Sequence, residues 1–220
     1  MAFNDNNKTN AETAKFMPFS IERPEELTSP VVFASPHSGR MYPYSFLNAS
    51  RLDDKQIRRS EDAFIEELFA AAPQFGAPLM HAHFPRAYVD ANREGYELDP
   101  DMFREQLPEW VNTTSSRVIA GLGTVARIVA GGAEIYNKRL DVQEVISRIE
   151  ECHRPYHRAL SALIDEAMAK FGCCLLVDCH SMPSLAASGI NGHTQTDIIL
   201  GDCHGSSCSL SFQPCFMLHL

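Results

Sequence analysis

The chain has 220 residues, of which 45% are hydrophobic and 21% are charged, and its formal net charge is −9 at pH 7. This length and composition suit one soluble globular domain with a sizeable core. The negative charge argues against a nucleic-acid partner, and the absence of any run of about 18 apolar residues argues against a membrane span.

The N-terminal residues and the cysteines indicate where the protein acts. Residues 1–15 are polar and lack the apolar stretch of a secretory signal, so we expect residues 1–20 to form a disordered tail. Seven cysteines, two of them adjacent at Cys173 and Cys174, favour reduced thiols over a disulfide framework. We therefore expect a cytoplasmic protein.

The first predicted strand is the apolar run Pro30–Ser35, which ends in the turn Pro36-His37-Ser38-Gly39. Proline fixes φ and glycine permits a positive φ, so the chain should turn sharply there. Helical spacing of apolar residues predicts a helix over Glu61–Ala72, with the preceding serine as its N-cap. Its first turn would contain Glu61 and Asp62, which are either functional carboxylates or favourable charge at a helix start.

Residues 77–84 are predicted to form a second strand, in which His81 and His83 share one face. An H-x-H pair of this kind can bind a metal ion. No acidic or cysteine neighbour completes a ligand set, so two half-exposed strand histidines are the simpler interpretation.

The next segment, 85–94, alternates polar and apolar residues and is predicted to be extended, with one strongly polar face. Arginine is suited to bidentate recognition of a carboxylate, and asparagine supplies both a donor and an acceptor. This composition favours a substrate-facing role over a solvated edge strand. The polar residues are Arg86, Tyr88, Asp90, Asn92 and Arg93.

A long loop and a long helix follow. Residues 97–112 are predicted to form a loop of the kind that covers a site. Leu140–Lys170 carries the longest helical pattern, and Pro155 should kink or split this helix. His153 and His157 lie four residues apart and therefore share a face. They could form a metal pair, but packing or a hydrogen bond to a neighbouring loop is the interpretation that we favour.

The last predicted strand, Cys173–Val177, ends in Asp178-Cys179-His180. Ligands of open α/β sheets bind beyond the carboxyl ends of the strands. Because two predicted strands each end near a His-Ser pair, His37 and His180 can meet at one sheet edge and bind a metal ion. For either histidine alone, a hydrogen-bonded structural pair would be the simpler interpretation.

Four blocks of sequence occur in order between about Pro30 and about Cys208: Ser35-Pro36-His37-Ser38-Gly39, Ser60-Glu61-Asp62-Ala63-Phe64, Arg86-Ala87-Tyr88-Val89-Asp90-Ala91-Asn92-Arg93 and Asp178-Cys179-His180-Ser181-Met182-Pro183. In this order they resemble the motifs of the N-formylglutamate amidohydrolase family, which is similar in fold to the zinc carboxypeptidases and aspartoacylases. The resemblance implies an α/β fold, phosphorylase/hydrolase-like, with three α/β/α layers on a mixed sheet, over residues 21–208.

The resemblance also implies a zinc hydrolase that uses metal-activated water. Its substrate would be a small molecule, an N-acylated acidic amino acid such as N-formylglutamate, from which it removes the formyl or a similar acyl group. At the matching positions, His37, Asp62 and His180 would bind Zn2+. Two histidines and one carboxylate suit a hydrolytic zinc, because three protein ligands leave a position for water.

Further residues receive roles around that metal. Arg86, Asn92 and Arg93 match a polar block that would bind the substrate carboxylate or polarise the scissile carbonyl. Asp178 and Ser181 would not bind the metal themselves but would orient the residues that do. The remaining requirement is a general base, for which Glu61 is the nearest acidic residue.

The C-terminal residues depart from the family. Family members continue with a strand that carries a glutamate similar to the carboxypeptidase general base, whereas residues 209–220 contain no Asp, Glu, Lys or Arg. We therefore expect residues 209–220 to be a non-family tail from a frame-shifted or shortened reading frame, a fold incomplete at its C-terminus, and weak catalysis. Two alternatives remain: a non-catalytic remnant that binds metal or an amino acid, and a structural α/β domain.

Overall fold

The computed structural model describes residues 16–183, 197–203 and 205–208. The chain divides into two compact units, residues 1–181 and 182–220, and all the helices and strands described below lie in the first. Most of the expected N-terminal tail and all of the expected tail 209–220 lie outside the described residues, whereas Phe19 and Ser20 already belong to a strand. No helix in the described part of the chain is long and apolar enough to cross a membrane.

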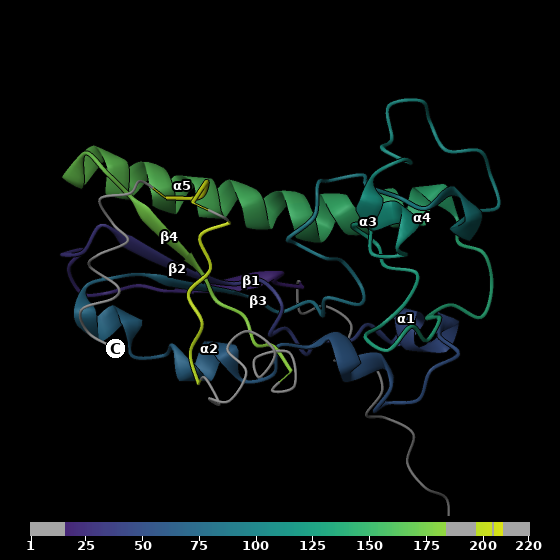
Figure 1. Cartoon of the computed structure of the whole chain (residues 1–220), viewed down its shortest axis with the longest axis horizontal. Helices are drawn as coiled ribbons and strands as arrows, with labels where there is room; N and C mark the ends of the chain where they lie inside the picture. The colour runs from purple at the N-terminus through teal and green to yellow at the C-terminus, as the bar shows by residue number, and fades with distance from the viewer. Residues whose placement is uncertain (1–15, 184–196, 204, 209–220) are drawn as a thin grey trace, which may run out of the picture. The chain divides into compact units, whose positions relative to one another are not determined.

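Four strands form one mixed sheet, in the order β1-β3-β2-β4 (Figure 1). β2 pairs in parallel with both β3 and β4, and β1 pairs antiparallel with β3. Because β2 and β4 are parallel neighbours, the segments that follow them leave the sheet at the same edge. The strands are β1 (Phe19–Glu22), β2 (Val31–Ser35), β3 (Leu79–Ala82) and β4 (Leu175–Asp178). The expected α/β fold with a mixed sheet is therefore confirmed.

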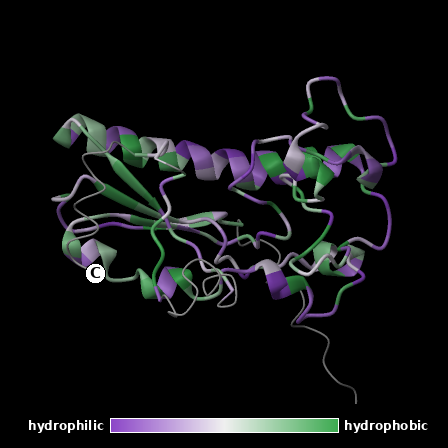
Figure 2. Ribbon diagram, viewed as in Figure 1, coloured by the Kyte–Doolittle hydropathy of each residue, from purple (hydrophilic) through white to green (hydrophobic). Residues whose placement is uncertain are grey.

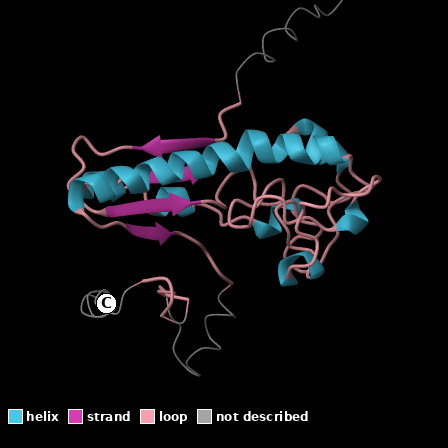
Figure 3. Cartoon of the chain, turned by 90° about the horizontal axis from the view of Figure 1, so that it is seen from above, coloured by secondary structure: helices cyan, strands magenta, loops and turns pink. Residues whose placement is uncertain are grey.

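The longest helix, α5 (Arg154–Phe171), lies along one face of the sheet (Figures 1 and 3). Its buried residues include Leu160, Leu163 and Ala167, which recur at helical spacing and pack with Val32 and Met80 of the sheet. On the other face, Phe33 of β2 contacts Phe69, and their ring centroids are 5.6 Å apart. Figure 2 shows hydrophobic strands beside an α5 with alternating hydrophobic and hydrophilic turns.

The remaining helical segments are short. They are α1 (Tyr44–Ala49), η1 (Ile57–Ser60), α2 (Ile65–Leu68), η2 (Ala72–Phe75), η3 (Pro100–Met102), α3 (Ser116–Ile119), α4 (Val142–Arg148) and η4 (Ile149–His153). Residues 97–112 are mostly irregular, as predicted, but Leu98, Met102 and Phe103 are buried in a second core cluster. This segment is therefore packed into the protein over much of its length.

The helix predicted over Glu61–Ala72 is wrong. Only α2 is α-helical there, and Phe64 immediately before it has a φ of 66°, in the left-handed region that interrupts a helix. Ser60 accepts a hydrogen bond from the backbone of Ala130 instead of capping the helix.

The extended segment predicted over 85–94 is also wrong. The backbone N–H groups of Tyr88 and Val89 both donate to the carbonyl of Pro85, so the chain turns immediately. Alternation along the sequence consequently does not place these residues on one face. Instead, Arg86 and the backbone of Asn92 are joined by hydrogen bonds to the carboxylate of Asp90, described below.

The helix predicted over Leu140–Lys170 forms as α4, η4 and α5 in direct succession. η4 is a π-helical turn in which the N–H of Arg154 donates to the carbonyl of Ile149, five residues earlier. Pro155 follows directly and has no N–H to donate, so the wider turn accommodates it without ending the helix.

Candidate metal centre

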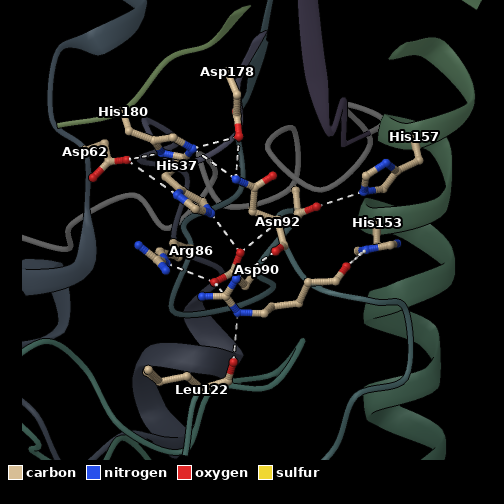
Figure 4. A network of polar contacts seen from close by, with 12 residues as sticks. His37, Asp62, Arg86, Asp90, Asn92, Leu122, His153, His157, Asp178 and His180 are labelled. Carbon is tan, nitrogen blue, oxygen red and sulfur yellow. Dashed lines mark hydrogen bonds and ion pairs between the residues drawn. The ribbon is translucent and has the colours of Figure 1, made fainter. Parts of the chain in front are cut away.

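Two histidines from neighbouring strands meet at one edge of the sheet. His37 follows β2 and His180 follows β4, and their ring centroids are 4.8 Å apart. One ligand atom each from His37, Asp62 and His180 lies within 4.8 Å of the other two. Figure 4 shows the three side chains pointing toward one another. The structure thus brings together the three residues that the sequence assigns to a metal.

Asp62 reaches this cluster from an irregular segment. Its backbone N–H donates to the carbonyl of His37 at 3.1 Å, which fixes the two segments side by side. Its Oδ2 lies 2.8 Å from Nδ1 of His180 and 3.4 Å from Nδ1 of His37. Ser181 donates from Oγ to Oδ1 of Asp62 at 3.2 Å, so this serine supports a predicted ligand.

Each histidine also contacts a second carboxylate through its outer nitrogen. His37 Nε2 lies 2.8 Å from Oδ1 of Asp90, and His180 Nε2 lies 2.9 Å from Oδ2 of Asp178. Histidines that bind metals usually donate their other N–H to a carboxylate or carbonyl in this way. The contact of Asp178 agrees with the role expected for it, whereas sequence reasoning missed the pairing of Asp90 with His37.

The donor set fits a divalent metal ion. Nδ1 of His37 is buried and makes no hydrogen bond within the described structure, although it faces Asp62. Buried polar atoms without a partner are rare and costly, and a metal ion bound to this nitrogen would remove that cost. Two imidazoles and one carboxylate form a common set for a hydrolytic zinc.

The electrostatics of the cluster favour a cation. Burial alone would raise the pKa of Asp62, but the hydrogen bond with His180 and the charge interactions with His37 and His180 outweigh burial and hold that pKa well below its usual range. The pKa values of Asp90 and Asp178 are lowered in the same way, by their histidine partners against burial. Burial lowers the pKa of His180, but hydrogen bonds to Asp178 and Asp62 raise it to about 9.

Two arginines surround the carboxylate of Asp90. Arg86 donates from Nε to Oδ2 of Asp90 at 2.9 Å, and Nε of Arg93 lies 3.7 Å from the same oxygen. Arg93 also donates to the carbonyls of Leu122 and Asn92, whereas both Nη atoms of Arg86 have no partner among the described residues. Arg86 therefore has the freer guanidinium group.

Asn92 contacts the His180 side of the cluster. Its Nδ2 donates to Oδ2 of Asp178 at 2.6 Å and lies 3.0 Å from Nε2 of His180. Asn92 is exposed, so its amide can contact a bound molecule as well as the site.

Glu61 has other partners. Its Oε1 accepts hydrogen bonds from Tyr42 Oη at 2.6 Å and from Arg58 Nη1 at 2.8 Å. The structure thus gives the predicted general base a phenol and a guanidinium as neighbours, and does not pair it with the three clustered ligands.

The other histidine pairs have protein partners. His83 contacts Ser20 Oγ and the carbonyl of Met17, each at 2.8 Å, and Nε2 of His81 lies 3.7 Å from Oε1 of Glu22, which agrees with the structural interpretation of this pair. His153 and His157 contact backbone carbonyls of residues 93 and 91, so the favoured alternative of a hydrogen bond to a neighbouring loop is confirmed.

The chain is similar to a described protein family and to curated proteins. Residues 29–217 match the family model described as N-formylglutamate amidohydrolase. An N-formylglutamate deformylase of Pseudomonas aeruginosa is 26% identical over 182 residues, and one of Pseudomonas putida is 25% identical over 181 residues. Each alignment covers 81% of this chain and 61% of the relative, so the chain spans about three fifths of the length of these curated proteins.

The fold also has a counterpart of known structure. The crystal structure of N-formylglutamate amidohydrolase from Ralstonia eutropha JMP134 superposes with a TM-score of 0.76 and 32% sequence identity. The superposition covers 89% of this chain and 70% of the crystallised chain.

Proposed function

The chain belongs to the N-formylglutamate amidohydrolase family, and we propose that it hydrolyses the formyl amide of an N-formylated acidic amino acid such as N-formylglutamate. In this reaction water adds to the formyl carbon, the C–N bond breaks, and formate and the free amino acid are released. The names of the similar proteins support the proposed substrate.

The observation that carries the proposal is the cluster of His37, Asp62 and His180. Its ligand atoms lie within 4.8 Å of one another, and Nδ1 of His37 is buried without a hydrogen bond. We propose that these residues bind Zn2+. When bound, the ion would lower the pKa of a water molecule to about 7 and polarise the amide carbonyl.

The chain's own residues prepare this centre. Asp90 and Asp178 hold the outer nitrogens of the two histidines and so orient the inner nitrogens toward Asp62. The side chain of His180 is 34% exposed, whereas that of His37 is 2% exposed. A substrate would therefore approach from the side of His180. Because Glu61 is held by Tyr42 and Arg58, we do not include it among the groups that act on the substrate.

We assign recognition of the substrate carboxylate to Arg86. Asp90 accepts a hydrogen bond from its Nε, and the guanidinium group retains two Nη atoms, which can bind a carboxylate in bidentate fashion. Arg93 donates to two backbone carbonyls, so we assign it the support of the loop that carries Asn92. Nδ2 of Asn92 lies 3.0 Å from Nε2 of His180, and this position supports a role for the amide in contacting the formyl oxygen or the substrate backbone.

The test measures metal binding and turnover separately. The purified chain is stripped with a chelator, titrated with Zn2+, and assayed for formate release from N-formylglutamate. We expect one Zn2+ per chain and formate release, both lost in His37→Gln and His180→Gln and both retained in the control His81→Gln, which lies on β3.

The alternative function is distinguished by the same experiment. Stoichiometric zinc without formate release would favour a protein that binds metal or an amino acid without turnover. Zinc binding that survives both His37→Gln and His180→Gln would contradict the proposed centre.

A further inference from the structure

Two histidines outside the metal cluster face the loop that carries Asn92. His153 is the last residue of η4 and His157 lies one turn later in α5, and their ring centroids are 4.3 Å apart. Figure 4 shows both rings directed from the helix toward this loop. π-helical turns such as η4 occur frequently at functional sites.

Both histidines donate to backbone carbonyls. Nε2 of His153 lies 2.9 Å from the carbonyl oxygen of Arg93, and Nε2 of His157 lies 2.8 Å from that of Ala91. A carbonyl oxygen only accepts hydrogen bonds, so Nε2 carries the proton in both rings. Burial lowers the pKa of His153, which is consistent with a neutral ring.

The two carbonyls flank Asn92, whose side chain contacts Asp178 and His180. On the opposite side, the same loop is held by Asp90, whose N–H donates to the carbonyl of Thr124, and by Arg93, which donates to Leu122. Within the described residues, the histidine pair supplies the side-chain hydrogen bonds that join α5 and η4 to residues 91–93. The loop is therefore attached from both sides, with Asn92 between the attachments.

We propose that His153 and His157 are positioning residues, which set the place of Asn92 beside His180 without touching the metal ligands or the substrate. This proposal rests on the proposed function for its effect on substrate, but the contacts themselves belong to the chain alone. A metal pair is excluded as the role of these nitrogens, because both Nε2 atoms are already donors to carbonyls.

The first test compares two substitutions of His157 with a matched control. His157→Phe keeps an aromatic ring but removes the hydrogen-bond donor. His157→Gln keeps an N–H donor at a similar distance from the backbone of residue 157. His83→Phe also removes a hydrogen bond to a backbone carbonyl, that of Met17, but one that does not involve residues 91–93.

We expect His157→Phe to raise KM for N-formylglutamate roughly 3- to 10-fold, which is the loss of about one hydrogen bond. The Zn2+ stoichiometry should stay at that of the wild type, since no ligand is on the loop. His157→Gln should restore KM to within about twofold, and His83→Phe should leave KM unchanged. A KM for His157→Phe within twofold of the wild type, or the same rise in His83→Phe, would overturn the proposal.

The second test does not depend on activity. Hydrogen–deuterium exchange of a peptide that covers residues 90–94 should be faster in His157→Phe than in the wild type or in His83→Phe. Equal exchange rates in all three proteins would refute the proposal that His157 holds residues 91–93. Because this measurement does not need turnover, it separates failure of this inference from failure of the proposed function. Should His157→Phe not fold, His157→Asn replaces it with the same expected results, because the shorter amide cannot reach the carbonyl of Ala91.

Discussion

At the scale of single residues, Asp90 connects the metal cluster with the residues assigned to substrate. Its Oδ1 lies 2.8 Å from His37 Nε2 and accepts from the N–H of Asn92 at 2.9 Å. Its Oδ2 accepts from Arg86 at 2.9 Å. The side chain is 4% exposed, so solvent does not compete for these contacts. One buried carboxylate therefore orients both the proposed metal ligand His37 and the proposed substrate-binding residue Arg86.

We predict that Asp90→Asn lowers Zn2+ affinity by about 10- to 100-fold, because His37 loses the charged partner that orients it. Competition with a chromogenic chelator measures this change. Asp99→Asn is the matched control, since Asp99 is also buried and accepts from an arginine Nε, that of Arg127 at 2.8 Å. Equal Zn2+ affinities for Asp90→Asn and Asp99→Asn would refute the role of Asp90.

Arg86 provides a test of substrate charge. We predict that Arg86→Gln raises KM for N-formylglutamate by roughly 10- to 100-fold, because hydrogen bonds to a charged group contribute about 1.5–3 kcal/mol. The KM for a neutral N-formyl amino acid should change far less. Arg127→Gln removes a comparable arginine from Asp99 and should alter neither KM. A similar rise for both substrates would show that Arg86 only supports the structure.

At the scale of elements, the site depends on how closely the segments after β2 and β3 cross. A Cβ at Gly39 would lie 2.1 Å from the carbonyl oxygen of Phe84 and 2.6 Å from the carbonyl carbon of His83. Met41 N–H donates to the carbonyl of His83 at 2.9 Å in the same crossing. Only glycine allows this approach, and the approach fixes the turn that carries His37.

We therefore predict that Gly39→Ala destabilises the protein by about 1–3 kcal/mol, as overpacking does. The melting temperature should fall by roughly 2–4 °C per kcal/mol, and Zn2+ affinity should fall with it because His37 moves. Gly201→Ala is the control, since a Cβ there meets no atom within 4 Å. An unchanged melting temperature for Gly39→Ala would contradict the close approach of Gly39 to the backbone of His83 and Phe84.

At the scale of the whole first unit, one helical run connects two core clusters. Val145 and Ile149 belong to the cluster around Phe46, whereas Cys152 and Tyr156 belong to the cluster on the sheet. Arg148, between Val145 and Ile149, is only 2% exposed. The run α4-η4-α5 thus attaches the irregular half of the unit to the sheet and also positions the two histidines that hold the site loop.

Arg148 tests this connection. Its guanidinium donates to Tyr136 Oη at 2.8 Å and lies 4.5 Å from the ring centroid of Tyr88. We predict that Arg148→Met lowers the free energy of unfolding by about 1–3 kcal/mol, from lost hydrogen bonding and cation–π attraction. Urea denaturation measures it. Arg23→Met, which breaks the exposed pair with Glu166, should cost no more than about 1 kcal/mol. An equal loss of unfolding free energy in Arg148→Met and Arg23→Met would show that the buried contacts of Arg148 stabilise the protein no more than an exposed ion pair does.

Much of the centre could be predicted from local sequence. Apolar runs located β2 and β4 to within two residues at either end, and each run is followed closely by a histidine. Parallel neighbouring strands end at the same edge, so His37 and His180 meet once both strands enter one sheet. The sequence by itself thus determined an α/β fold with two histidines at the carboxyl ends of its strands.

Only the tertiary structure decided how the irregular segments complete the site. Asp62 was expected on a helix and instead lies on an irregular stretch whose backbone is hydrogen-bonded to His37, while Asp90 was expected on an extended segment and instead lies on an irregular stretch between turns. Such segments have no period that a sequence pattern can report, and their conformation depends on partners far along the chain. Asp90 meets His37 across 53 positions, and His153 meets Arg93 across 60. Those contacts depend on the sheet and α5, which bring the segments together in the folded protein.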